Sequence, residues 1–195
     1  NQNYSFIKNL ISKNKLYCGF NHSLSNSIKC LFQQIKKNKI GSIHKVEINW
    51  NEDFNSILKA HPWIKNISSC YLSDINNGGG GAHEYSHAIH LALLFRKELL
   101  VNTTNTTYNI NYKKINNSKY DSKTRVIFRD KCASVILNIN TTSNPPQKNI
   151  KITGNDGEIF WERKIENGYE DVKINNGVIF KRRFKITRPD DFITQ

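Results

Sequence analysis

The chain has 195 residues, a formal net charge of +13, 37% hydrophobic residues and no methionine. No apolar run approaches the roughly 18 residues that a membrane-spanning helix needs, and no signal-peptide pattern follows the first basic residue. We therefore expect a cytoplasmic protein with no membrane partner, folded as one domain or as one domain plus a fragment of another. The missing methionine indicates an excerpt of a longer polypeptide.

The basic residues are spread along the chain rather than gathered on one element. Asn, Ile and Lys contribute 27, 25 and 22 residues, a bias typical of an AT-rich coding sequence. A nucleic-acid binder more often concentrates its Lys and Arg on one element with aromatic residues between them. We therefore expect a solvated basic surface and no nucleic-acid partner. The four cysteines show no CxxC spacing, so buried free thiols are the expectation.

The first part of the chain predicts helix, strand, helix, strand in that order. Apolar residues with helical spacing occur in residues 4–13, and residues 16–20 resemble a short buried strand. Residues 25–39 again have helical spacing, and Gly41 supplies a natural helix stop. Residues 43–50 alternate between apolar and polar side chains, which predicts a half-buried strand.

The rest of the chain predicts one long helix followed by a sheet. Residues 51–81 show no periodicity and end in a glycine run, and residues 83–100 form the strongest helix pattern. Turn signals then separate seven predicted strands, which together favour an antiparallel meander. We expect an α+β fold with an open, largely antiparallel sheet packed with helices. The predicted strands are 106–113, 124–130, 132–140, 148–153, 157–163, 170–174 and 177–184.

The segment from Gly78 to His90 is the richest in potential chemistry and allows three interpretations. Its His83-Glu84-Tyr85-Ser86-His87 stretch fits the HExxH pattern, in which two imidazoles on one helix face bind zinc and the glutamate acts as base. A third ligand is needed, and the metzincin continuation is absent, so our preferred prediction includes no metal. Alternatively, the glycines before a helix N-terminus form a phosphate cradle, although neither GxGxxG nor GxxxxGK[ST] is present.

The third interpretation is a family resemblance. Gly-Gly-Gly-x-x-x-Glu-x-x-His at the start of an apolar helix resembles the substrate-side signature of the Gfo/Idh/MocA oxidoreductases, the glucose–fructose oxidoreductase and inositol dehydrogenase family. Further stretches resemble that family in the same order along residues 5 to 192. They are Tyr17–His22, Ile28–Lys39 followed by Ile40–Ile43, and Ile152–Trp161, with His61–Trp63, Tyr71-Leu72 and Pro146–Lys148 resembling a sugar-modifying branch.

The resemblance implies a two-domain enzyme that uses NAD or NADP. Residues 1–24 would be the last helix and strand of a Rossmann domain, whose GxGxxG and Glu-Lys-Pro motifs would lie before Asn1. Residues 25–195 would form the C-terminal domain, which shapes the substrate site and forms a homo-oligomer through its sheet face. The implied substrate is a sugar or nucleotide sugar, oxidised or reduced at a secondary hydroxyl or keto group. Polysaccharide biosynthesis is the context that the branch resemblance implies.

The resemblance also implies roles for individual residues. His87 matches the active-site histidine and would be the catalytic acid/base, because oxidising a secondary hydroxyl requires a group that takes its proton. Glu84, one helical turn away, would orient it. The chain departs from common family patterns in having His83 where an aspartate is frequent, His90 where Asp or Asn is common, and Ser23 where Arg often follows the Asn-His pair. The remaining candidates are His61, Trp63, Tyr71 and His83 for substrate binding and Asn21 and His22 for cofactor binding.

Two other functions stay open at this point. A non-enzymatic sugar-binding or assembly module would keep the same fold but lack the upstream nucleotide motifs in the full gene. A zinc hydrolase would use His83, Glu84 and His87 and would carry stoichiometric zinc.

Overall fold

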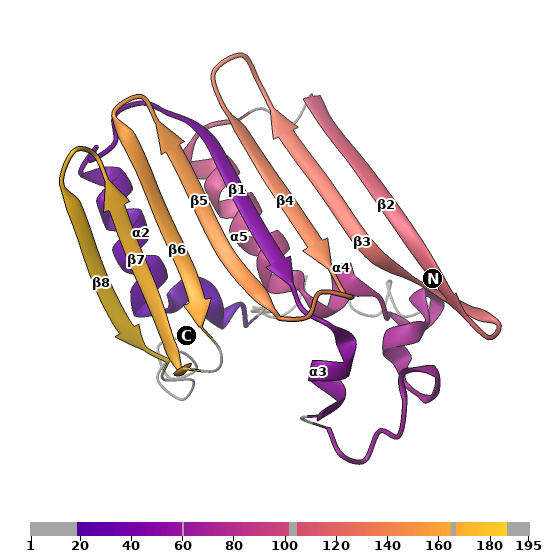
Figure 1. The fold of residues 1–195 in the computed structure, drawn as a ribbon. Helices are drawn as coiled ribbons and strands as arrows, with labels where there is room; N and C mark the ends of the chain where they lie inside the picture. The colour runs from indigo at the N-terminus through magenta and orange to yellow at the C-terminus, as the bar shows by residue number, and fades with distance from the viewer. Residues whose placement is uncertain (1–18, 60, 102–104, 165–166, 187–195) are drawn as a thin grey trace, which may run out of the picture.

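A computed structural model describes residues 19–59, 61–101, 105–164 and 167–186. One eight-stranded sheet organises these residues, and two helices, α2 and α5, cover one of its faces (Figure 1). No helix in these ranges is long and apolar enough to cross a membrane. The strands are β1 Ile43–Asn51, β2 Thr106–Ile115, β3 Ser118–Arg129, β4 Ser134–Asn140, β5 Gln147–Gly154, β6 Gly157–Lys164, β7 Tyr169–Asn175 and β8 Ile179–Lys185. The helices are α2 Asn26–Lys36, α3 Phe54–Lys59, α4 Gly81–Glu84 and α5 Ser86–Glu98, with short 3₁₀ turns η1 Asn21–Leu24, η2 Ile67–Ser69, η3 Tyr71–Ser73 and η4 Ile75–Asn77.

The strand order is β2-β3-β4-β1-β5-β6-β7-β8. The predicted α+β architecture and largely antiparallel sheet are confirmed, but the sheet is two antiparallel meanders rather than one. β1 lies between them, parallel to β4 and antiparallel to β5. Local turn signals predict which strands follow one another by hairpins. They do not reveal that an earlier strand is inserted between two later ones.

The core lies between the sheet and the two helices. On β1 the alternation of side chains places Val46, Ile48 and Trp50 in the core, with each no more than 2% exposed. The helix α5 contributes a fully buried stripe at helical spacing, so the two periodicities in the sequence meet at one interface. That stripe consists of Ala88, Leu91, Ala92 and Phe95.

The long helix predicted for residues 83–100 is interrupted. Helical structure begins earlier, at Gly81, breaks at Tyr85 and ends at Glu98. Tyr85 has φ −99° and ψ 33°, and its backbone N–H closes α4 on the carbonyl of Gly81. Its buried phenol donates a 2.8 Å hydrogen bond to the backbone carbonyl of Glu52, just after β1. This tertiary contact holds the helix break in place, and the local spacing of apolar residues does not predict the break.

The N-terminal elements agree only in part with the predictions. The helix predicted for residues 4–13 lies outside the described residues, as does most of the strand predicted for residues 16–20. Gly19 and Phe20 are not in a strand, and Phe20 instead stacks on His90 with ring centroids 4.4 Å apart. The next helix, α2, is shorter than the predicted 25–39 at both ends. The Ser25 hydroxyl caps its start by accepting a 3.3 Å hydrogen bond from the backbone N–H of Ile28, and Asn38, with a left-handed φ of +51°, follows its end.

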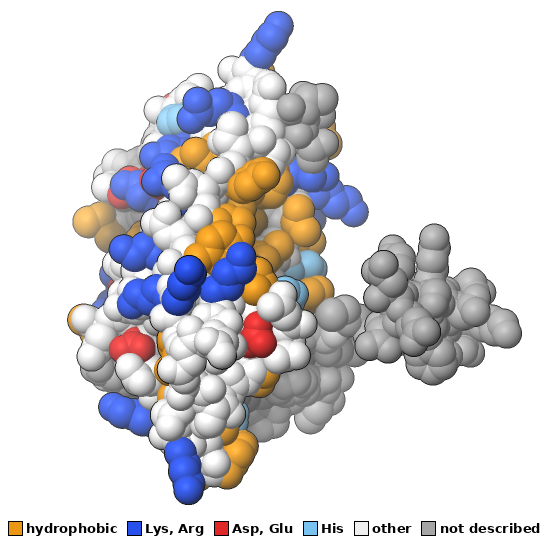
Figure 2. Space-filling view, turned by 90° about the vertical axis from the view of Figure 1, so that its right-hand side faces the viewer, with side chains coloured by type: hydrophobic (Ala, Val, Ile, Leu, Met, Phe, Trp, Pro, Cys, Tyr) orange, Lys and Arg blue, Asp and Glu red, His pale blue; other side chains and the backbone are white. Residues whose placement is uncertain are grey.

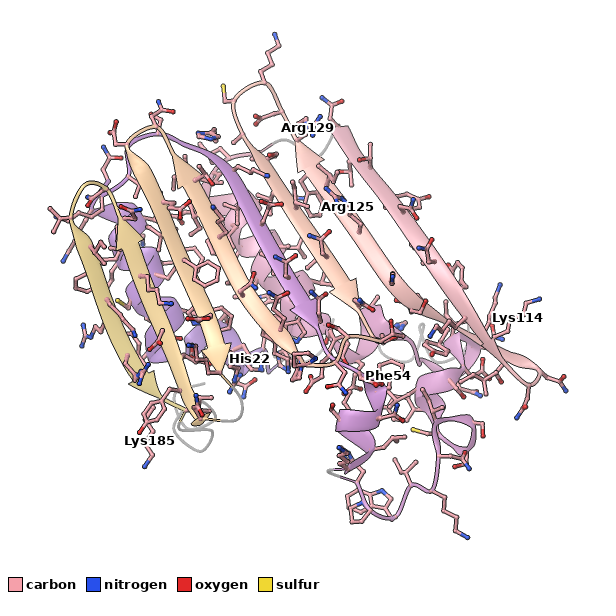
Figure 3. The ribbon with its side chains drawn as sticks, in the orientation of Figure 1. His22, Phe54, Lys114, Arg125, Arg129 and Lys185 are labelled. Carbon is pink, nitrogen blue, oxygen red and sulfur yellow. The ribbon has the colours of Figure 1, made fainter. Side chains whose placement is uncertain are left out.

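Both edges of the sheet are exposed and basic. The edge strands β2 and β8 are the least buried strands of the sheet. Figure 2 shows Lys and Arg side chains along the whole β2 side, with hydrophobic side chains between them. Lys114 and Lys185 lie at the ends of the two edge strands (Figure 3). Charged edge strands discourage pairing with a second sheet, so part of the positive charge has a structural use.

Candidate functional site

A polar cavity of about 290 Å³ opens at the end of the sheet where β1 runs into α3. Its size lies at the lower limit of small-molecule sites. The walls come from η1, the end of β1, α3 and the turn after it, the junction between α4 and α5, and the start of β5. The lining residues are His22, Trp50, Glu52, Ser56, Ile57, His61, Glu84, Tyr85, His87 and Lys148.

His87 lies at the start of α5, packed against the residues that precede α2. Its ring meets that of His22 edge to face, with centroids 4.6 Å apart, and that of Phe20 at 5.8 Å. His22 in turn packs edge to face on Trp50 at 5.2 Å. Figure 3 places His22 and Phe54 at this same end of the sheet. Two predicted site residues that are 65 positions apart in the sequence therefore line one cavity side by side.

The glycine run is a close-packing device. A Cβ at Gly79 would overlap the carbonyl oxygen of Tyr71, and one at Gly80, where φ is +99°, would overlap the carboxylate of Asp121. That carboxylate, on β3, accepts a 2.8 Å hydrogen bond from the backbone N–H of Ala82 in the first turn of α4. A carboxylate from the protein thus occupies the position that the phosphate-cradle interpretation reserves for a ligand anion. Gly80 is required because the backbone passes directly over Asp121 of β3, and Gly79 because it passes over the backbone of Tyr71.

The HExxH interpretation requires His83 and His87 on one continuous helix, and the break at Tyr85 separates them. His83 is exposed, its Nδ1 lies 3.1 Å from the carbonyl oxygen of Gly79, and it does not line the cavity that His87 lines. Within the described ranges, no three His, Cys, Asp or Glu side chains are grouped so that they could hold a metal ion. The substrate-binding role predicted for His83 has no support from its position outside the cavity.

Glu84 lines the cavity, but with a partner that the sequence did not indicate. The hydroxyl of Tyr71 donates a 2.9 Å hydrogen bond to its carboxylate. Burial and the neighbouring Glu84 raise the pKa of Tyr71 to about 12, so its phenol stays a donor at neutral pH. The pair brings Tyr71 to the rim of the cavity, although Tyr71 is 53% exposed and does not line it.

The other predicted site residues divide between the cavity and the surface. His61 lines the cavity, and its Nδ1 lies 2.8 Å from the carbonyl oxygen of Ile57. Trp63 packs edge to face on His61 at 5.1 Å but is 74% exposed and lies outside the lining. Asn21 is buried beside His22 in η1 and does not line the cavity.

Solved structures provide the comparison, since no protein-family profile and no curated protein matches the chain. A levoglucosan dehydrogenase in complex with NADH and levoglucosan is 12% identical and superposes with a TM-score of 0.61, over 86% of this chain and 46% of that one. An inositol dehydrogenase homologue from Azotobacter vinelandii in complex with NAD⁺ is 11% identical, with a TM-score of 0.58 over 85% and 42%. An oxidoreductase domain protein from Kribbella flavida is 14% identical, with a TM-score of 0.58 over 88% and 48%.

The chain has the fold of the C-terminal domain of the Gfo/Idh/MocA oxidoreductases. This confirms the fold that the ordered motifs implied. The chain spans less than half the length of each of these solved structures. Their activities and cofactors therefore bear on this chain only as a basis for proposals.

Six cavity residues were not predicted as site residues, and three of them form one group, although Lys148 ends the Pro146–Lys148 motif. Lys148 at the start of β5 forms a 2.6 Å ion pair with Glu52, and its ammonium lies 5.3 Å from the centroid of the Trp50 ring. Lys148 and Glu52 have side chains only 12% and 15% exposed, so the pair is shielded from solvent. Trp50 and Lys148 face each other in the register of β1 and β5. Trp50 and Glu52 lie at the end of a half-buried strand. That position is the one signal in the sequence that could have marked them as site residues.

The cavity is equipped to bind a hydroxyl-rich molecule. It presents imidazoles, carboxylates and an ammonium group, which together both donate and accept hydrogen bonds. Burial and the carboxylates of Glu52, Glu84 and Asp53 raise the pKa of Tyr85, which keeps its phenol protonated. Burial lowers the pKa of His90, which stacks on Phe20 and does not line the cavity, so that ring stays neutral at physiological pH. His87, in the first turn of α5, is one of three imidazoles that line the cavity.

Proposed function

We propose that this chain is the substrate-side domain of an NAD- or NADP-dependent oxidoreductase. Its substrate is a sugar or nucleotide sugar that reacts at a secondary hydroxyl or keto group. The observation that carries the proposal is His87 at the start of α5, lining a polar cavity beside His22 in this fold. Solved structures with the same fold contain NADH together with levoglucosan or L-sorbose, which supports this choice of substrate class.

His87 is the proposed acid/base. It takes the proton of the substrate hydroxyl during oxidation and returns it during reduction, a role suited to an imidazole near neutral pH. Glu52 and Lys148 position neighbouring hydroxyls, because one accepts hydrogen bonds and the other donates them. Glu84, held by Tyr71, contributes a further acceptor at the rim.

The nicotinamide cofactor supplies the hydride acceptor or donor when bound. The described residues suit its reactive end rather than its phosphates, because Asp121 occupies the N-terminus that the glycine run leads into. Asn21 and His22 remain the residues proposed to approach the cofactor, with His22 lining the cavity. The phosphates would be bound by a separate domain, with residues 1–24 as its last part and residues 25–195 as the substrate domain.

We also propose that the complete enzyme is cytoplasmic and forms a homo-oligomer through the open face of the sheet, which is the face opposite α2 and α5. That face carries a hydrogen-bonded row of amide side chains. Asn138 donates a 2.9 Å hydrogen bond to Asn49, which donates another of 2.9 Å to Asn149. Such a row offers a second copy a polar surface of defined geometry.

The decisive test is turnover by the complete gene product that contains this chain. It is assayed with NAD⁺ and NADP⁺ against a panel of sugars and nucleotide sugars, by absorbance of the reduced nicotinamide. His87→Ala should lower kcat by roughly 10²–10⁴-fold with the fold intact. His83→Ala is the matched control, because His83 lies on the neighbouring helix outside the cavity, and it should leave kcat within a few-fold of wild type.

Two results would contradict the proposal. Activity of His87→Ala within a few-fold of wild type would remove the acid/base assignment. Sugar binding measured by calorimetry, without turnover of any panel member and without a GxGxxG motif in the complete gene, would identify a binding module of the same fold instead.

A further inference from the structure

A second pocket lies on the open face of the sheet, away from the candidate site. It is a groove of about 350 Å³ over β2, β3, β4 and the end of β1, so it is larger than the cavity that His87 lines. The groove and the cavity share no lining residue. Asn51 lines the groove and its neighbour Trp50 lines the cavity, because successive side chains of a strand point to opposite faces.

Two rows of side chains build this groove. Each row crosses the sheet through the register of the strands and places one cation of β3 between asparagines of the neighbouring strands. The lining members are Asn109, Arg125 and Asn138 in one row and Asn111, Lys123, Asn140 and Asn51 in the other. Neighbouring strands lie about 4.8 Å apart, and residues two apart on one strand about 6.7 Å, so one small molecule can contact both rows. We call this set of residues the amide groove.

The two cations of the amide groove have no charge partner in the described part of the chain. Lys123 and Arg125 are exposed and form neither an ion pair nor a side-chain hydrogen bond there, and no Asp or Glu lines the groove. On the other half of the same face, by contrast, Arg183 donates a 2.8 Å hydrogen bond to Asp171. Figure 3 shows Arg125 on β3, which is an inner strand, so protection of a sheet edge does not explain its charge.

The side chains of the amide groove suit a small hydroxylated anion. The planar guanidinium of Arg125 can donate two parallel hydrogen bonds to a phosphate or a carboxylate, and Lys123 adds a second positive charge. An asparagine amide both donates and accepts hydrogen bonds, as a sugar hydroxyl does. The volume of the groove lies at the lower end of the range for small-molecule sites. A sugar that carries a phosphate or a carboxylate combines these features.

A second copy of the chain is the alternative occupant, because the open face is also the proposed oligomer face. That copy would have to bring a carboxylate to Lys123 and Arg125. The carboxylates that the described strands carry on this face already pair with Lys or Arg, which neutralises them. They are Glu47, Glu158, Glu162 and Asp171. A separate anion therefore matches the charge of the groove better than a second copy does.

We propose that the amide groove binds a sugar phosphate or a sugar acid. Its anionic group binds Arg125 and Lys123, and its hydroxyls bind the asparagine amides. The site goes beyond the proposed function and does not rest on it, because the groove and the candidate active site have separate linings on opposite faces of β1.

The test is calorimetric titration of the complete gene product with four kinds of probe. They are hexose phosphates, hexuronates, the matching neutral hexoses and inorganic phosphate. At least one hexose phosphate or hexuronate should bind, more tightly than inorganic phosphate and than its neutral hexose, and its affinity should fall as salt is added. Comparison of the two anionic series shows whether the groove takes a phosphate or a carboxylate.

Three variants locate the binding. Arg125→Gln should weaken the affinity for the bound sugar anion by roughly 10-fold or more, because it removes a charged hydrogen-bond donor. Arg129→Gln is the matched control, since Arg129 lies on the same strand, removes the same charge and does not line the groove (Figure 3); it should change the affinity by about twofold or less. Asn109→Ala/Asn111→Ala should weaken binding of the sugar anion and leave that of inorganic phosphate unchanged. All four positions are exposed, so the variants should fold.

Four results would overturn the proposal. They are absence of binding by every anionic sugar, equal affinities of Arg125→Gln and Arg129→Gln, binding of a single-stranded oligonucleotide but of no sugar anion, and dissociation of an oligomer by Lys123→Gln/Arg125→Gln without any anion binding. The last result, measured by sedimentation, would assign the groove to a second copy of the chain. Absence of turnover by the wild type would contradict the proposed function and leave the titrations intact, so the two failures are distinguishable.

Discussion

Replacing Gly80 with alanine tests the structural explanation of the glycine run. Gly80 has φ +99° and ψ 167°, a region that only glycine adopts readily, and forcing another residue into it costs about 1–3 kcal/mol. The new Cβ would also overlap the Asp121 carboxylate, which holds the N–H of Ala82 at 2.8 Å and the hydroxyl of Thr124 at 3.0 Å. Losing a hydrogen bond to a charged group costs about 1.5–3 kcal/mol.

We therefore expect Gly80→Ala to lower the free energy of unfolding by about 3–6 kcal/mol. Gly78→Ala is the matched control. Gly78 also has a positive φ, +78°, but no described atom lies within 4 Å of a Cβ built there. It should cost only the left-handed backbone penalty of about 1–2 kcal/mol. Both values come from urea unfolding followed by circular dichroism.

A third variant separates the cost of the strained backbone at Gly80 from the cost of the overlap with Asp121. In an Asp121→Ala background the overlap no longer exists, so Gly80→Ala should cost only the backbone contribution of about 1–3 kcal/mol. The resulting coupling between the two positions should be about 1 kcal/mol or more. Equal destabilisation by Gly80→Ala and Gly78→Ala, or no coupling to Asp121, would refute the explanation that Gly80 is needed for close packing on Asp121. The glycine run would then again be a candidate anion-binding site.

Two further predictions concern stability and exposure. The hydrogen bond and charge of Arg183 lower the pKa of Asp171 in the folded protein. The ionised carboxylate therefore stabilises the fold fully at any pH above the pKa of Asp in the unfolded chain, about 4. This stabilisation is lost as the pH falls from there through the lowered pKa of the folded state. The difference in urea midpoint between wild type and Arg183→Met should therefore be full at neutral pH and shrink below about pH 4; a difference independent of pH would contradict it. Trp63 is 74% exposed whereas the other two tryptophans are at most 2% exposed, so iodide should quench one of three. Trp63→Phe should abolish that quenching, and persistent quenching would show that the cavity tryptophan is accessible.

Most of the fold could be predicted from the sequence because its signals are local. Apolar alternation and turn residues locate six of the seven later strands to within two residues at each end, whereas β3 begins at Ser118, six residues before its predicted start. β1 was predicted as residues 43–50 against an observed Ile43–Asn51. The failures have a common cause. The insertion of β1 beside β4 and the break at Tyr85 both depend on partners distant in the sequence.

The candidate site was predicted less completely. His22, His61, Glu84 and His87 line the cavity and carry recognisable motifs. Lys148 ends the Pro146–Lys148 motif, but its position in the cavity depends on the register that sets it opposite Trp50, across nearly a hundred residues of chain. Glu52 gives no signal in the sequence beyond following a half-buried strand. Its place in the cavity depends on its contact with Lys148, which composition and spacing do not report.

The position of β1 also explains why a cavity forms at this end of the sheet. The next strand along the chain, β2, runs parallel to β1, because β2 is antiparallel to β3, β3 is antiparallel to β4, and β4 is parallel to β1. The chain that leaves β1 must therefore cross over before it can re-enter the sheet. The first part of this crossover contains α3, three 3₁₀ turns, the glycine run and α4, and α5 follows it. Because β5 begins beside the end of β1, Lys148 faces the same space from the other side. The segment without periodicity therefore forms a wall of the candidate site, and Gly80, which packs it onto Asp121 of β3, helps to set where α5 begins and so where His87 lies.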